Sequence, residues 1–216
     1  MGAPSSSSSA PYTCTRVKVG LTTSSAKKPK AKLRAWLHLL LAWASGGPVA
    51  GARTVGNNGE AEFLWPDTPT VPTAAAASAT LCDLVQLAED CGRLPLPLFD
   101  LTSAAFAESW CGAAGRDADP EEQGERLAAA VAKASEAWFG GGFSSQPAER
   151  LDRWIAALHP SWTPQDGVKD VDLNNFGKIG PHSFMKLALK VWEAPTLARR
   201  TSRDLSTALK SFEVTK

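Results

Sequence analysis

The chain has 216 residues and a formal net charge of +1, and its length is enough for one domain with a sizeable hydrophobic core. The charge is unevenly distributed, because residues 1–59 contain eight Lys or Arg and no Asp or Glu, whereas residues 60–177 contain 19 acidic and 7 basic side chains. A nucleic-acid binder needs a basic face across its folded domain, so we expect no nucleic-acid partner.

Residues 1–34 are predicted to form a disordered basic leader, because they are rich in Ser, Thr, Pro and Lys. Two kinds of targeting fit this segment. Its start, from Met1 to Ser6, matches the short pattern for N-myristoylation. Its acid-free, Ser-rich composition is also typical of an organelle import signal.

Residues 35–52 form an apolar segment that resembles a secretory signal. Its ten-residue centre is apolar except for His38, and it is too short to span a membrane, which takes about 20 residues. A basic flank precedes this centre and small residues follow it, so we predict signal cleavage between Ala52 and Arg53. The alternative interpretation of the segment is an ordinary buried helix.

Residues 53–80 are predicted to be an extended Pro/Ala-rich connector, because Pro66, Pro69 and Pro72 do not fit the interior of a helix. Residues 81–216 are predicted to form a helical domain. Helices are expected from about Ala74, a strong helix former through Ala79, to Gly92, from Asp100 to near Gly112, and at 121–139, 148–158, 182–193 and 195–214.

Two of these helices have the clearest apolar stripes. The first, 121–139, carries Leu127, Ala130, Val131, Ala134 and Trp138 on one face. The second, 148–158, carries Leu151, Trp154, Ile155 and Leu158 on one face and Glu149, Arg150, Asp152 and Arg153 on the other. The loop between them contains three glycines, so an antiparallel hairpin that buries the two stripes against each other is expected. The predicted fold class is mainly α, an antiparallel helical hairpin or bundle with Pro/Gly-rich connectors and little or no sheet.

Three cysteines remain if the leader is removed, and all three are disulfide candidates: Cys82, Cys91 and Cys111. Cys82 and Cys91 lie nine residues apart, half a turn out of phase on a straight helix, so we do not expect them to bond each other. Buried reduced thiols are the alternative. The cysteine spacings match no zinc site, and the polar stretch from Asp172 places Phe176 and Ser183 where a calcium loop needs ligands, so no metal site is expected.

No catalytic chemistry is expected. The sequence contains no nucleophile elbow, no dinucleotide fingerprint, no phosphate-binding loop and no H-E-x-x-H zinc motif. Its three histidines, His38, His159 and His182, are widely separated, and a catalytic pair of Cys111 with His159 or His182 would be a coincidence of composition. We therefore predict no catalytic, cofactor-binding or metal-ligating residue and no cofactor.

Several segments carry a resemblance to a known family. They are Asn58-Gly59-Glu60-Ala61-Glu62-Phe63, Leu81-Cys82-Asp83-Leu84-Val85-Gln86-Leu87-Ala88, Phe99-Asp100-Leu101-Thr102, and the spaced Trp110, Trp138, Trp154 and Trp162. Over about residues 35–165, the chain resembles the variant surface glycoproteins of African trypanosomes. The resemblance implies a helical, homodimerising coat domain with a disulfide through Cys82 and a role in antigenic shielding and immune evasion, without catalysis.

Two functional hypotheses follow. The first is a non-catalytic coat protein at the cell surface or secreted, which associates with a membrane only through an anchor supplied elsewhere, because the chain ends in a charged segment. The alternative is a helical interaction subunit inside the cell, in the mitochondrion or another organelle, whose basic N-terminus is an import signal.

Overall fold

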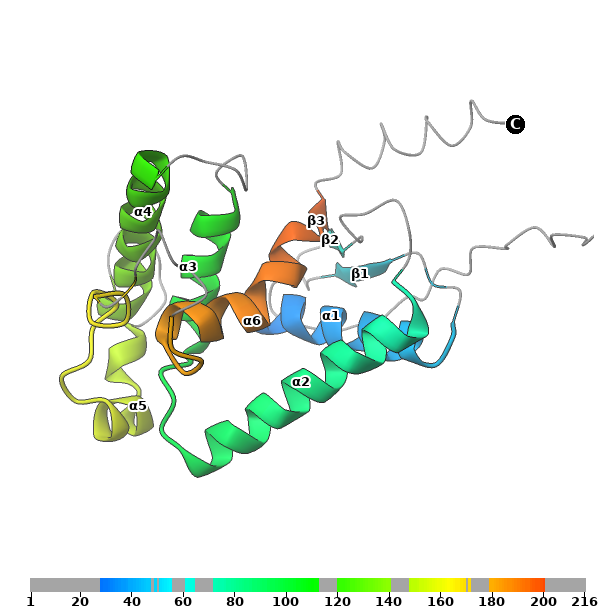
Figure 1. The fold of residues 1–216 in the computed structure, drawn as a ribbon, viewed down its shortest axis with the longest axis horizontal. Coiled ribbons are helices and arrows are strands. Elements are labelled where there is room, and N and C mark those ends of the chain that lie inside the picture. The colour runs from blue at the N-terminus through cyan, green and yellow to red at the C-terminus, as the bar shows by residue number, and fades with distance from the viewer. Residues whose placement is uncertain are drawn as a thin grey trace, which may run out of the picture.

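The structure is a computed structural model that describes residues 28–47, 49, 51–55, 61–64, 72–112, 120–140, 148–169, 171 and 179–200. The described chain is mainly helical, as predicted from the sequence, with one small antiparallel sheet (Figure 1). The elements in chain order are α1 (Pro29–Ala44), β1 (Ala52–Val55), β2 (Ala61–Leu64), α2 (Ala74–Arg93), α3 (Asp100–Gly112), α4 (Pro120–Phe139), the 3-10 turn η1 (Glu149–Leu151), α5 (Arg153–Leu158), α6 (Phe184–Leu197) and β3 (Arg199–Arg200).

The apolar segment that resembles a signal is a core helix, α1. Pro29 stands in its first turn, where the missing amide hydrogen costs nothing. Its buried residues recur at three- and four-residue spacing, while Arg34 and His38 are exposed on the opposite face. The buried set is Ala31, Lys32, Ala35, Trp36, Leu39, Leu40 and Trp43. The alternative interpretation, an ordinary buried helix, therefore describes this segment.

Both ends of α1 are tied to the rest of the fold. Near its start, the buried Lys32 donates from Nζ to Glu108 Oε1 on α3 over 2.5 Å. At its end, Trp43 Nε1 donates to the carbonyl of Val49 over 2.6 Å. Ala52, beside the predicted cleavage point, is buried in β1. Cleavage between Ala52 and Arg53 stays a prediction, and it would separate α1 from the core that it fills.

The small sheet lies where an extended connector was predicted. β1 pairs with β2 in antiparallel register from Ala52 opposite Leu64 to Val55 opposite Ala61. β2 also pairs with β3, which places Leu64 opposite Arg199. The predicted connector of residues 53–80 thus contains most of β1, all of β2 and the first turns of α2.

Helix α2 begins at Ala74, earlier than the predicted domain start at residue 81. The side chain of Thr73 caps it by accepting a hydrogen bond from the amide of Ala76 over 3.2 Å. Its buried residues are Ala77 and Leu87, and most of its other side chains face solvent. The helix lies along α1, with which it shares a hydrophobic core (Figure 1).

Helices α3, α4 and α6 enclose an aromatic core. Phe99 lies 4.8 Å from Trp138 and 4.6 Å from Trp162, measured between ring centroids, and Phe106 contacts Phe184 edge to face at 5.2 Å. Tilted and edge-to-face rings suit the aromatic quadrupole and fill the core without voids. The stripe on α4 therefore packs on α3 and this aromatic core.

The predicted hairpin is wrong in its second helix. Residues 148–158 form the turn η1 and the short helix α5, with Asp152 between them in extended conformation. The main partner of α4 is α3, beside which it lies in Figure 1. α3 covers the stripe on α4, and of the predicted apolar face of residues 148–158 only Ile155 packs against the core, while Leu151, Trp154 and Leu158 are exposed.

Three predictions lie outside the described residues. They are the leader through residue 27, the polar stretch at 172–178 and the part of the last predicted helix beyond residue 200. The start predicted for that last helix, residue 195, lies inside α6, because α6 continues through Pro195 to Leu197.

Candidate interaction surface

An exposed apolar group lies on η1 and α5. Leu151, Trp154 and Leu158 are 67%, 65% and 60% exposed, more than any other large apolar side chain among the described residues. Trp154 and Leu158 stand four residues apart on one side of α5, and Leu151 lies on η1, on the other side of the extended Asp152. Ile155, between them, is partly buried against the aromatic core and anchors the segment to it. Exposed apolar side chains that gather in this way mark a binding surface more often than isolated ones do.

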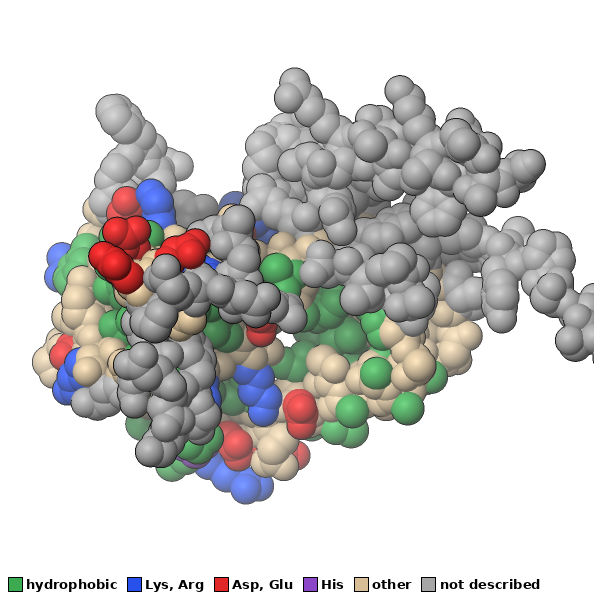
Figure 2. All heavy atoms as spheres, turned by 45° about the horizontal axis from the view of Figure 1, so that its top comes forward, with side chains coloured by type: hydrophobic (Ala, Val, Ile, Leu, Met, Phe, Trp, Pro, Cys, Tyr) green, Lys and Arg blue, Asp and Glu red, His purple; other side chains and the backbone are tan. Residues whose placement is uncertain are grey.

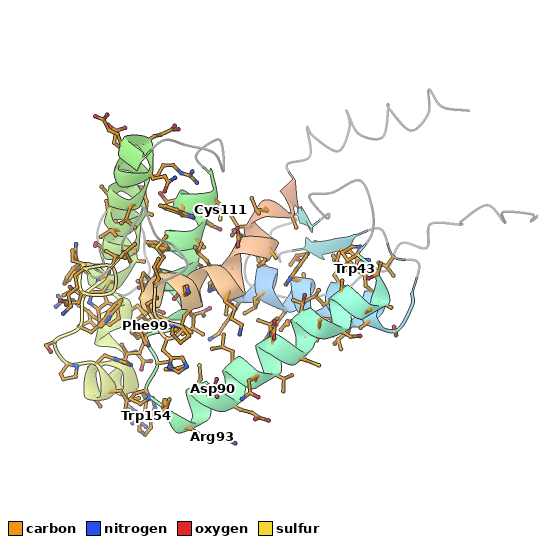
Figure 3. All side chains as sticks on the ribbon, viewed as in Figure 1. Trp43, Asp90, Arg93, Phe99, Cys111 and Trp154 are labelled. Atoms are coloured by element: carbon orange, nitrogen blue, oxygen red, sulfur yellow. The ribbon has the colours of Figure 1, made fainter. Side chains whose placement is uncertain are left out.

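Two arginines extend this group. The guanidinium of Arg153 lies 4.8 Å from the ring centroid of Trp154, and that of Arg150 lies 5.2 Å from the ring centroid of Phe139 at the end of α4. Such cation–π contacts hold the charges beside the apolar side chains. We call Phe139, Arg150, Leu151, Arg153, Trp154 and Leu158 the α5 surface. In Figure 3, Trp154 lies at the lower edge of α5, on the side of the Arg93 end of α2 in this view.

The buried carboxylate of Glu149 holds η1 in place. Its Oε1 accepts a hydrogen bond from the amide of Leu101 over 2.9 Å, and its Oε2 accepts one from the amide of Thr102 over 2.7 Å. These amides belong to the first turn of α3 and have no partner within that helix, and the helix dipole favours a negative charge there. Glu149 is only 8% exposed, although the helical pattern placed it on a solvent face. It fixes the α5 surface relative to α3.

Asp152 separates η1 from α5. Its Oδ1 accepts hydrogen bonds from the amides of Trp154 over 2.9 Å and Ile155 over 3.3 Å, which makes it the N-cap of α5. An Asp directly before a helical Arg-Trp-Ile run is a capping signal that the periodicity alone did not reveal. The two carboxylates near the α5 surface are therefore both engaged with backbone amides.

His159 closes α5 at its C-terminal end. Its ring meets Phe99 edge to face at 5.2 Å, and burial lowers its pKa below the usual value because the charged imidazolium is poorly solvated there. The imidazole is thus held neutral at physiological pH and serves as a packing group at this end of the helix.

The disulfide candidates lie apart from this surface. Cys82 and Cys91 are exposed on α2, and Cys111 is half-buried near the end of α3; all three are thiols in the structure. The pKa of Cys91 is raised, first by partial desolvation of its thiolate at the helix surface and then by the negative charge of Asp90. Disulfide formation among the three stays a prediction.

The structure separates Cys111 from His159. His159 packs on Phe99 just before α3, whereas Cys111 lies twelve residues further on. At 1.5 Å per residue, the two ends of this helix are about 18 Å apart, and Figure 3 shows Phe99 and Cys111 at its opposite ends. His182 is exposed in the turn before α6, and His38 is exposed on α1. Cys111 and His159 therefore do not meet as a nucleophile and its base.

Neither a metal-binding cluster nor a membrane-spanning helix is found among the residues that the structure describes. Within them, no group of three or more His, Cys, Asp or Glu side chains is placed to hold a metal ion. No helix in the same part of the chain combines the length and the apolar character needed to cross a bilayer.

Residues 10–110 match the model of the RecC C-terminal domain, a stretch just short of half the chain. The matched stretch includes α1, β1, β2, α2 and most of α3, and it ends before the α5 surface. No curated protein matches the chain.

This match corrects the resemblance to trypanosome variant surface glycoproteins. The segments that suggested that family, from Asn58 to Phe63 and from Leu81 to Ala88, both lie within the stretch similar to the RecC C-terminal domain. RecC belongs to a family of DNA-repair enzyme subunits, so the predicted cell-surface coat, its immune-evasion role and its surface or secreted location are wrong. The short helices and spaced tryptophans that carried the resemblance are common to many helical proteins.

Proposed function

We propose that this chain is a non-catalytic helical interaction subunit that works inside the cell in a DNA-processing assembly and binds a partner protein through the α5 surface. The observation that carries the proposal is the exposed group of Leu151, Trp154 and Leu158. Burying one such side chain is worth about 1.5–3 kcal/mol, so three left in water together favour a partner that covers them.

The similarity to the RecC C-terminal domain supports the cellular setting. That domain belongs to a subunit of a DNA helicase and nuclease complex. The matched half of the chain holds the buried contacts of α1 with α2 and α3, whereas the α5 surface lies in the other half. We therefore assign the family-like role to the first half and partner binding to the second.

The proposal places the chain beside DNA without direct binding to it. Residues 60–177 carry 19 acidic against 7 basic side chains, which opposes a phosphate-tracking face on this part of the chain. Figure 2 shows acidic side chains gathered at one end of the molecule, and Glu121 and Glu122 stand in the first turn of α4. Contact with DNA is assigned to the partner proteins.

The non-catalytic part of the proposal rests on the sequence, which lacks the nucleophile, phosphate-binding, dinucleotide and zinc-protease motifs. The separation of Cys111 from His159 by the length of α3 supports it. The purified full chain is expected to show no nuclease or ATPase activity with magnesium, and either activity at a turnover above about 1 per second would contradict this part.

The cellular test uses the tagged full chain in its own cells. We expect affinity purification to recover components of DNA-repair or recombination complexes with the wild type and with the matched control Val85→Ala. Val85 is 59% exposed on α2, outside the α5 surface. We expect the Leu151→Ala, Trp154→Ala double variant to lose them by about tenfold or more, a binding difference of about 1.4 kcal/mol.

Two results would refute the proposed function. One is recovery of no DNA-processing component with the wild-type chain. The other is labelling of the chain by a membrane-impermeant biotinylation reagent on intact cells, because that would place it at the cell surface. Thermal unfolding of the variants serves as the folding control, since substitutions of exposed residues are expected to change stability by about 0.5 kcal/mol or less.

A further inference from the structure

We draw no further inference here: the strongest candidate, the exposed apolar surface patch formed by Leu151 on η1 and by Trp154 and Leu158 on α5, carries nothing beyond the proposed function, because nothing in the described part of the chain shows what covers it.

Discussion

Replacing Glu149 with alanine removes the carboxylate that joins η1 to the start of α3. Two amides, those of Leu101 and Thr102, lose their acceptor at 2.9 and 2.7 Å, in a site that is almost fully buried. A hydrogen bond to a charged group is worth about 1.5–3 kcal/mol, and loss of a helix cap costs about 0.5–2 kcal/mol. We expect Glu149→Ala to lower the free energy of unfolding by about 2–4 kcal/mol.

The assay is urea unfolding of the full chain followed by circular dichroism at 222 nm, with the slope m compared between variants to verify that the folded states are alike. Glu149→Gln keeps one neutral acceptor and is expected to lose about half as much stability. The matched control is Glu136→Ala, which removes an exposed ion pair with Lys133 and is expected to cost about 0.5 kcal/mol or less. A loss below about 0.5 kcal/mol in Glu149→Ala would refute the capping role.

Gly167→Ala is expected to lower the free energy of unfolding by about 1–3 kcal/mol in urea titrations, because the added Cβ would lie 2.7 Å from Phe184 Cβ. The lowered pKa of His159 means that its neutral form is favoured on folding, so its stabilising effect is complete above about pH 6.5 and is lost as pH falls through the folded pKa. Unfolding titrations between about pH 8 and 5 should show this loss, and His159→Gln should flatten it. For Cys91, Asp90→Asn should speed alkylation by iodoacetamide near neutral pH, because it removes the second cause of the raised pKa.

Each of these three predictions would be contradicted by a specific result. A Gly167→Ala variant as stable as the wild type would show that Phe184 can move aside. Unchanged pH dependence in His159→Gln would assign the acid sensitivity to other groups. An alkylation rate of Cys91 that Asp90→Asn leaves unchanged would show that desolvation alone raises the pKa of this thiol.

The sequence predicted the helical class because the periodicity of α2, α3, α4 and α6 is a local property. The predicted stripe of residues 121–139 matches α4, and the Asp100 start matches α3. The periodicity did not show which helix each apolar stripe packs against. The stripe on α4 packs on α3, whereas most of the similar stripe on residues 148–158 faces solvent and only Ile155 packs on the core. Pairing of helices depends on contacts across dozens of residues, which local spacing does not encode.

Local sequence was also insufficient for residues 35–52, the segment that resembles a secretory signal. A basic flank followed by ten apolar residues describes both a secretory signal and a helix buried by its neighbours. The sequence did carry a distinguishing feature, because Arg34 and His38 stand four residues apart and mark an exposed face on α1. Lys32 belongs to the buried face only because Glu108, 76 residues away, supplies its partner.

The candidate site was partly visible in the sequence. The apolar residues of the α5 surface were recognised as a stripe, but they were assigned to the core. In the structure, the extended Asp152 interrupts the predicted helix between η1 and α5, and Glu149 joins η1 to the first turn of α3. A long-range cap such as Glu149 has no sequence signature, since its amides lie 47 and 48 residues away.

The central claim is that a component of a DNA-processing assembly covers the α5 surface. Its most direct test is photo-crosslinking in living cells with Trp154→p-benzoylphenylalanine, with Val85→p-benzoylphenylalanine as the control. We expect position 154 to crosslink to a DNA-repair or recombination protein, and position 85 not to do so. Crosslinks from position 154 only to DNA or to a second copy of this chain, or to no partner at all, would contradict the account.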